Sequence, residues 1–215
     1  DSGGKFWDAT SKSASSSIRV PIGLGDSKAL VLDPKNIHFE TLGSYHQHVS
    51  KIAIDRVISI KAEKLLVNEK IVMTDYYASF IRLYLQSQDQ NAQRKWGESM
   101  IGNVYSNSKV VAFVIDGLFD NDKDLSVSIN YEIPERIFDV NEGKLLNFPA
   151  MWEPFTLRLS ESKERTRKKQ KPYSIIITTN TTLNLESLKV VGALPKSVSE
   201  DLPFFDYNVS SKIVD

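Results

Sequence analysis

A strict alternation of apolar and polar side chains between residues 125 and 133 constrains the fold more than any other feature. The odd positions hold large apolar residues, and the even positions hold Ser126, Ser128, Asn130 and Glu132. Side chains of a β-strand point to opposite faces in turn, so this period predicts a strand with one buried face and one solvated face. The segment 110–115 precedes it across a polar turn, and the two segments together predict a hairpin. Because 110–115 is apolar on both faces, it is predicted to be a buried central strand.

Residues 51–61 repeat the pattern, with isoleucine at positions 52, 54, 58 and 60. This spacing predicts a second strand. Arg56 falls on its apolar face, which indicates a bulge or a break in the strand. The short run Ala29–Leu32, in a region of loop signals, is a candidate edge strand.

One segment predicts an amphipathic helix. Thr74 and Asp75 are typical of a helix N-cap. Two apolar rows follow at helical spacing and form a wide stripe, which is typical of a helix packed on a sheet: Tyr76, Phe80 and Tyr84, and beside them Tyr77, Ile81 and Leu85. A second short helix near 95–100 is weakened by Gly97. Residues 155–159 and 173–179 predict another hairpin. The chain is therefore predicted to be α+β, a mainly antiparallel β-sheet with one principal amphipathic helix packed on it.

The chain of 215 residues is expected to form a flexible Ser-rich arm over residues 1–17 and a single globular domain over residues 18–215. It has no cysteine, which excludes disulfides, Cys-ligated zinc, iron–sulfur clusters and thiol nucleophiles. No apolar run approaches the roughly 18 residues that a membrane-spanning helix needs. The protein is therefore not expected to be an integral membrane protein.

Few residues suggest chemistry on a small substrate. His46 and His48 would share one face of a strand and are weak candidates for metal ligands, with no acidic third ligand close in sequence. The turn at Asp120, Asp122 and Asp124 opens like a calcium loop. Leu125 and Tyr131 then stand where that loop needs glycine and glutamate, so a solvated hairpin turn is the better interpretation. Nucleophile-elbow, phosphate-loop and dinucleotide motifs are absent. We therefore predict no catalytic residue, no cofactor and no small-molecule substrate: the chain is not expected to be an enzyme.

The segment 163–171 has the clearest physical consequence. It holds six cations and one anion in nine residues, while the whole chain balances 27 basic against 27 acidic residues. Such a cluster is stable when it is solvated or faces a polyanion, either anionic lipid or nucleic acid. A solvated hairpin tip is the simpler alternative. The predicted polyanion-binding residues are Lys163, Arg165, Arg167, Lys168, Lys169 and Lys171.

The order of elements from about residue 50 to 180 resembles the globular part of rhabdovirus matrix proteins. Residues 143–149 (Gly-Lys-Leu-Leu-Asn-Phe-Pro), Trp152 and residues 154–159 are similar to the stretch that leads into a late hairpin there. The resemblance implies a protein that self-associates beneath a viral envelope and contacts lipid and nucleocapsid. The chain departs from that family in being neutral overall and in having no Pro-Pro-x-Tyr motif.

These observations predict a viral structural protein of the matrix type. It would form homo-oligomers, meet other viral proteins, and contact anionic membrane or nucleocapsid through the basic segment. The expected locations are the virion, the host cytoplasm or the nucleus. Three alternatives stay open: a capsid or nucleic-acid-transport (movement) protein, a non-viral protein-binding module, and a metal-dependent enzyme built on His46 and His48. The sequons at Asn180 and Asn208 would matter only in an exported chain.

Overall fold

A computed structural model describes residues 27–42, 49–61, 63–140, 143–146, 174–185, 196–202 and 205–210. The chain divides into two compact units, residues 1–184 and residues 185–215. The arm predicted over residues 1–17 lies outside the described residues. One globular domain over residues 18–215 stays a prediction.

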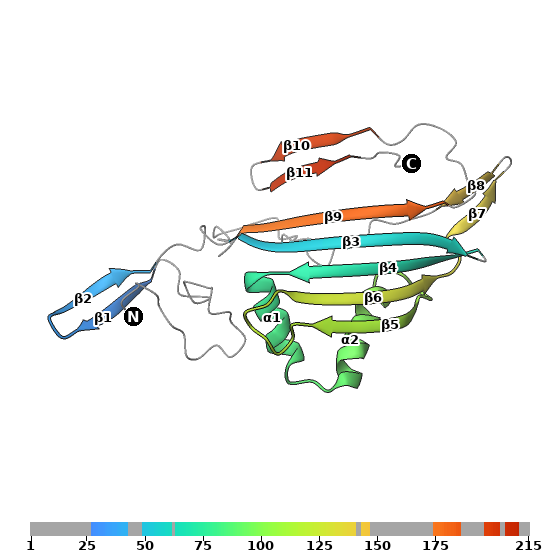
Figure 1. Cartoon of the computed structure of the whole chain (residues 1–215). Coiled ribbons are helices and arrows are strands. Elements are labelled where there is room, and N and C mark those ends of the chain that lie inside the picture. Colours follow the sequence, from blue (N-terminus) through green and yellow to red (C-terminus); the bar gives the residue numbers. More distant parts are fainter. Residues whose placement is uncertain are drawn as a thin grey trace, which may run out of the picture. The chain divides into compact units, whose positions relative to one another are not determined.

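A five-stranded sheet dominates the first unit, with the strand order β5–β6–β4–β3–β9 (Figure 1). Its strands are β3 (Val49–Lys61), β4 (Lys64–Met73), β5 (Lys109–Asp116), β6 (Leu125–Ile133) and β9 (Ser174–Asn184). The pairings are antiparallel except that between β3 and β9, which is parallel. Helix α1 (Asp75–Leu85) contacts β3, and helix α2 (Gln90–Gly102) contacts β5. The α+β class is confirmed, with two helices against the sheet where one principal helix was predicted.

Three smaller antiparallel hairpins complete the described strands. The first unit contains β1 (Lys28–Asp33) with β2 (Asn36–Thr41), and β7 (Ile137–Val140) with β8 (Gly143–Leu146). The second unit contains β10 (Val198–Leu202) with β11 (Phe205–Val209). The candidate edge strand at residues 29–32 is thus one half of the β1–β2 hairpin.

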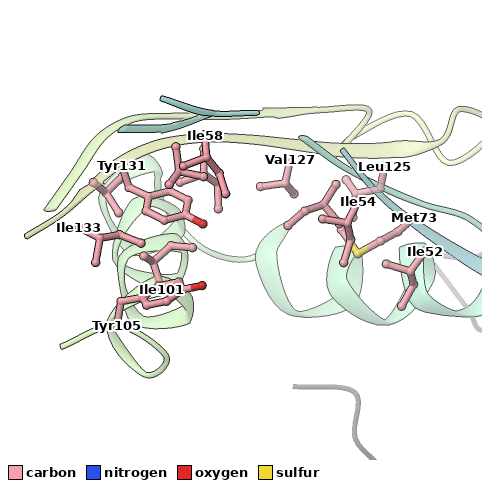
Figure 2. Close-up of a cluster of buried hydrophobic side chains, with 14 of the residues drawn as sticks. Ile52, Ile54, Ile58, Met73, Ile101, Tyr105, Leu125, Val127, Tyr131 and Ile133 are labelled. Atoms are coloured by element: carbon pink, nitrogen blue, oxygen red, sulfur yellow. The ribbon is translucent and has the colours of Figure 1, made fainter. Parts of the chain in front are cut away.

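The core lies between the helices and one face of the sheet. Alternate residues of β3, β4 and β6 point into it and pack against Ala78, Leu85 and Ile101 of the helices. Figure 2 shows Ile52, Ile54, Ile58, Met73, Leu125, Val127, Tyr131 and Ile133 converging there with Ile101 and Tyr105. The alternation that predicted β3 and β6 therefore marks the buried face in both strands.

Two strand predictions were wrong in detail. Arg56 neither bulges nor breaks β3, because it sits in continuous register opposite Glu69 of β4. The segment 110–115 forms an edge strand and not a central one, with Val111 and Val114 more than half exposed. Its six consecutive apolar residues place apolar side chains on both faces of β5, and the face that carries Val114 is not buried. The alternating strand β4 was not predicted.

Helix α1 begins where it was predicted, but its capping differs. Thr74 occupies the N-cap position, yet its hydroxyl accepts from the backbone N–H of Lys51. The hydroxyl of Ser50 accepts from the N–H of Tyr76 instead, so strand β3 caps the helix. The predicted apolar stripe is also only half buried: Phe80 and Tyr84 are 54% exposed.

Helix α2 packs close against β5 at Gly97, where the absence of a side chain leaves room for the Phe113 ring. A Cβ atom at position 97 would lie 2.3 Å from the Phe113 ring, well inside van der Waals contact. The Trp96 ring meets the same Phe113 ring edge-on, with their centroids 6.3 Å apart. The glycine that weakened the helix prediction therefore permits the packing that stabilises the helix.

Candidate functional site

The predicted polyanion-binding segment, residues 163–171, lies outside the described residues. The described chain resumes at Ser174, the first residue of β9. The partner predicted for this strand, residues 155–159, also lies outside them. The residues from Lys163 to Lys171 therefore stay predicted ligands of an anionic surface.

The histidines do not meet within the described structure. His38 lies on β2, where it is exposed and its Nδ1 is 3.1 Å from the backbone oxygen of Asn36. His46 and His48 fall in the gap between residues 42 and 49, outside the described residues. Within the described ranges, no group of three His, Cys, Asp or Glu side chains is placed to hold a metal ion.

Side chains of helix α1 hold the acidic turn between β5 and β6 by hydrogen bonds to its backbone. Buried Arg82 donates from Nε to the carbonyl oxygen of Gly117, at 3.0 Å, and from Nη2 to that of Lys123. Gln86, one helical turn later, donates to the carbonyl oxygen of Leu118 at 2.7 Å. Gly117 itself has a φ of +74°, a conformation that favours glycine. The turn is thus a structured loop, held through its backbone.

The carboxylates of this turn surround a buried cation. Burial lowers the pKa of Arg82, and the charges of Asp120, Asp124 and Asp122 oppose that shift. A shallow cleft of about 260 Å³ opens beside them, lined by Lys51, Thr74, Asp75, Arg82, Asn121, Asp122, Lys123 and Asp124. Its three cationic and three anionic side chains balance one another. The cleft therefore offers no net charge to attract an ionic ligand.

A second buried polar group lies in the core itself. The Nε of Arg56 is 2.7 Å from Oε2 of Glu69, and both side chains are at most 3% exposed. The hydroxyl of Tyr131 donates to the same Oε2 at 3.0 Å, and Nη1 of Arg56 donates to Thr181 Oγ1 at 3.2 Å. The cluster thus joins β3, β4, β6 and β9 through side chains.

Two tyrosine rings cover this ion pair. Tyr105 stacks on Tyr131 with centroids 6.2 Å apart, and the guanidinium of Arg136 lies 5.9 Å from the centre of the Tyr105 ring. Burial raises the pKa of both tyrosines above the ordinary value; Glu69 also raises it, while Arg56 lowers it. Such shifts are typical of catalytic groups, but they also occur in structural networks. Arg56, Glu69, Tyr105 and Tyr131 are all buried, so we assign this cluster a structural role.

Exposed apolar side chains indicate where a partner could bind better than the buried polar clusters do. On β1–β2, two cross-strand pairs share one face: Leu30 with Phe39, and Leu32 with Ile37. All four side chains are between 51% and 74% exposed. We call these four residues the hairpin apolar face. Helix α1 adds Phe80, Leu83 and Tyr84, each more than half exposed.

Sequence reasoning missed most of these features for identifiable reasons. The partner of Arg56 could have been found, since Glu69 sits at an apolar position of an alternating segment, Leu65 to Met73. Arg82 gave a weaker signal, as a cation between two apolar rows of a helix. The hairpin apolar face gave none, because alternating apolar residues normally mark a buried face.

Comparisons with models of known protein families, with the sequences of characterised proteins and with solved structures give no match to this chain. Within the described residues, neither helix has the length and apolar content required to cross a bilayer.

Proposed function

We propose that this chain is a self-associating structural protein of the matrix type, which meets an anionic membrane or nucleocapsid through the basic segment 163–171. The observation that carries the proposal is the hairpin apolar face. Self-association and polyanion contact are separate properties, and each has its own test.

The hairpin apolar face needs a partner for physical reasons. An isolated two-stranded hairpin is at best marginally stable in water, and it normally requires packing against something else. Each buried side chain of this size contributes about 1.5–3 kcal/mol, so covering four of them is a substantial driving force. The described structure leaves all four exposed. Exposed apolar groups that cluster in this way mark interaction sites.

A second copy of the chain is the occupant we favour. The face carries no charge, so it offers a charged ligand nothing to pair with. The chain has no net charge, so two copies meet without long-range repulsion. The resemblance to matrix proteins also implies self-association.

The basic segment supports the second half of the proposal. Six cations within nine residues attract an anionic surface, and a net charge of zero gives the rest of the chain no general affinity for one. Anionic lipid and RNA are both candidates, and binding measured with each of them separates the two.

Sedimentation velocity over a dilution series tests self-association. We expect oligomers that dissociate on dilution, and we expect Phe39→Lys to shift the equilibrium toward monomer by tenfold or more, since about 1.4 kcal/mol corresponds to that factor. His38→Lys is the matched control, because it places the same side chain on the opposite face of the same strand. A wild-type chain that stays monomeric at every concentration, or equal effects of both variants, would contradict the proposal.

A further inference from the structure

The two edges of the five-stranded sheet differ in how they are protected. Exposed edge strands invite pairing with other chains, and soluble proteins block them with charged residues, proline or bulges. Strand β5 has two such protections. Lys109 and Asp116 stand at its ends, and the register is interrupted at Val111.

Strand β9 has none of them. Its sequence, Ser-Ile-Ile-Ile-Thr-Thr-Asn-Thr-Thr-Leu-Asn, contains no charged residue and no proline. It pairs with β3 without a register shift over its whole length of 11 residues, roughly 36 Å at 3.3 Å per residue. Within the described part of its unit, the opposite edge has no neighbouring strand. We call this side of the strand the β9 edge.

Contacts on both faces hold β9 in place. On the core face, Thr181 accepts from buried Arg56 at 3.2 Å. On the other face, Asn180 Nδ2 donates to Asp55 Oδ1 at 2.9 Å. The β9 edge is therefore a continuous, anchored row of backbone donors and acceptors. Such an edge is ready for β-strand addition without prior rearrangement.

We propose that the β9 edge pairs antiparallel with the β9 edge of a second copy, about a two-fold axis at Thr179. The two five-stranded sheets then form one continuous sheet, with the helices of both copies on the same side. This pairing deepens the proposed self-association and rests on it, but it uses a different surface from the hairpin apolar face.

The chemistry of β9 favours its own copy as the partner. A strand without charge meets itself without placing like charges opposite one another. An axis at Thr179 places Ile177 opposite Thr181 and Ile176 opposite Thr182, pairs of β-branched residues that stabilise sheets. Ile177 is 46% exposed on the core face, where the second copy can cover it.

Single cysteines test the pairing directly, because the chain contains none of its own. Residues opposite each other in antiparallel strands have Cα atoms about 4.5–5.5 Å apart, which is within disulfide range. We expect Thr179→Cys to form a disulfide-linked dimer under mild oxidation at least tenfold faster than Asn68→Cys, a control on the interior strand β4. Dominant cross-linking by Thr178→Cys or Asn180→Cys also supports the pairing and moves the axis by one residue.

A charge variant gives a second, independent measurement. Thr178→Lys and Asn68→Lys both replace exposed polar residues on the same face of the sheet. Only the first of these positions lies at the β9 edge, so only Thr178→Lys is expected to weaken the dimer, by tenfold or more in sedimentation. Equal dissociation constants for the two variants would contradict the inference.

The outcomes separate this inference from the proposed function. Oligomers that respond to Phe39→Lys, without rapid cross-linking at positions 178–180, overturn the β9 pairing and leave self-association standing. A wild-type chain that is monomeric throughout overturns both. About half of the β9 amides bond to β3 and are protected from hydrogen exchange in any state. Protection, in a monomer, of the alternate amides that point away from β3 would mean that the chain covers this edge itself, which also overturns the pairing.

Discussion

Arg56 and Glu69 face each other across the β3–β4 ladder, with the guanidinium Nε 2.7 Å from the carboxylate Oε2 inside the core. A buried ion pair is costly to desolvate, so it is tolerated only when hydrogen bonds satisfy its remaining atoms. Thr181 and Tyr131 supply two of them. The pair thereby links β9, an edge strand of the described sheet, to the centre of that sheet.

Glu69→Gln is expected to destabilise the fold by about 3–5 kcal/mol, because it leaves the buried guanidinium without its counter-charge. Urea denaturation measures the loss. The double variant Arg56→Met with Glu69→Leu is the control, and it should recover most of the lost stability, since an apolar pair avoids the desolvation cost. A double variant as unstable as Glu69→Gln would show that the ion pair itself is not responsible.

The stability of the fold should decrease at alkaline pH because of Tyr131 and Tyr105. Their pKa values are raised in the folded state, so above pH 10, the ordinary tyrosine pKa, the unfolded chain loses protons that the folded chain keeps. The stabilisation is complete below that pH and decreases above it by up to about 1.4 kcal/mol per pH unit for each tyrosine. Denaturation from pH 8 to 11 should therefore show a shallower decrease for Tyr131→Phe. If the wild-type chain and Tyr131→Phe lose stability equally over this pH range, Tyr131 is not a cause of the decrease.

Gly97→Ala should lower stability by about 1–2 kcal/mol, because the new methyl group meets the Phe113 ring and overpacking outweighs the gain in helix propensity. Gly102→Ala is the matched control on the same helix. Apart from its chain neighbours and the backbone of its own helix, no described atom lies within 4 Å of the place that its new Cβ would take, so it should stabilise the fold by a few tenths of a kcal/mol. Thermal unfolding should therefore give a lower melting temperature for Gly97→Ala and a slightly higher one for Gly102→Ala.

Arg82→Met should loosen the turn between β5 and β6, because it removes the donors that hold the carbonyl groups of Gly117 and Lys123. Hydrogen bonds from a charged group contribute about 1.5–3 kcal/mol each. We expect the amides of residues 117–124 to exchange at least tenfold faster. Lys123→Ala keeps the backbone oxygen that Arg82 contacts, and it should leave exchange in the turn nearly unchanged.

Changing Arg167, Lys168 and Lys169 to Gln should weaken binding to anionic vesicles or to RNA. For RNA, the slope of log K against log salt should become shallower by about two, since each phosphate contact contributes roughly 0.7. A control that changes the exposed residues Lys70, Lys95 and Lys109 to Gln removes the same charge elsewhere. Equal losses in both triple variants would mean that net charge, and not the basic segment, governs binding.

Local pattern predicted much of the fold. The alternation in β3 and β6 and the helical spacing of α1 are each complete within about a dozen residues, so no distant contact is needed to recognise them. Which side chains of helix α1 face the core was harder to predict. Phe80 and Tyr84 are exposed, whereas Arg82 is buried. Arg82 faces inward because its guanidinium donates to the backbone of a turn 35 residues later.

The sequence by itself determined the α+β class, the buried face of the alternating strands and the charge of the basic segment, because each depends on neighbouring residues. Only the tertiary structure decided that Arg56 pairs with Glu69, that β5 lies at an edge, and that β9 joins β3 in parallel. The physical reason is distance along the chain. Arg56 meets Thr181 across 125 positions, and no local period carries information about such a contact.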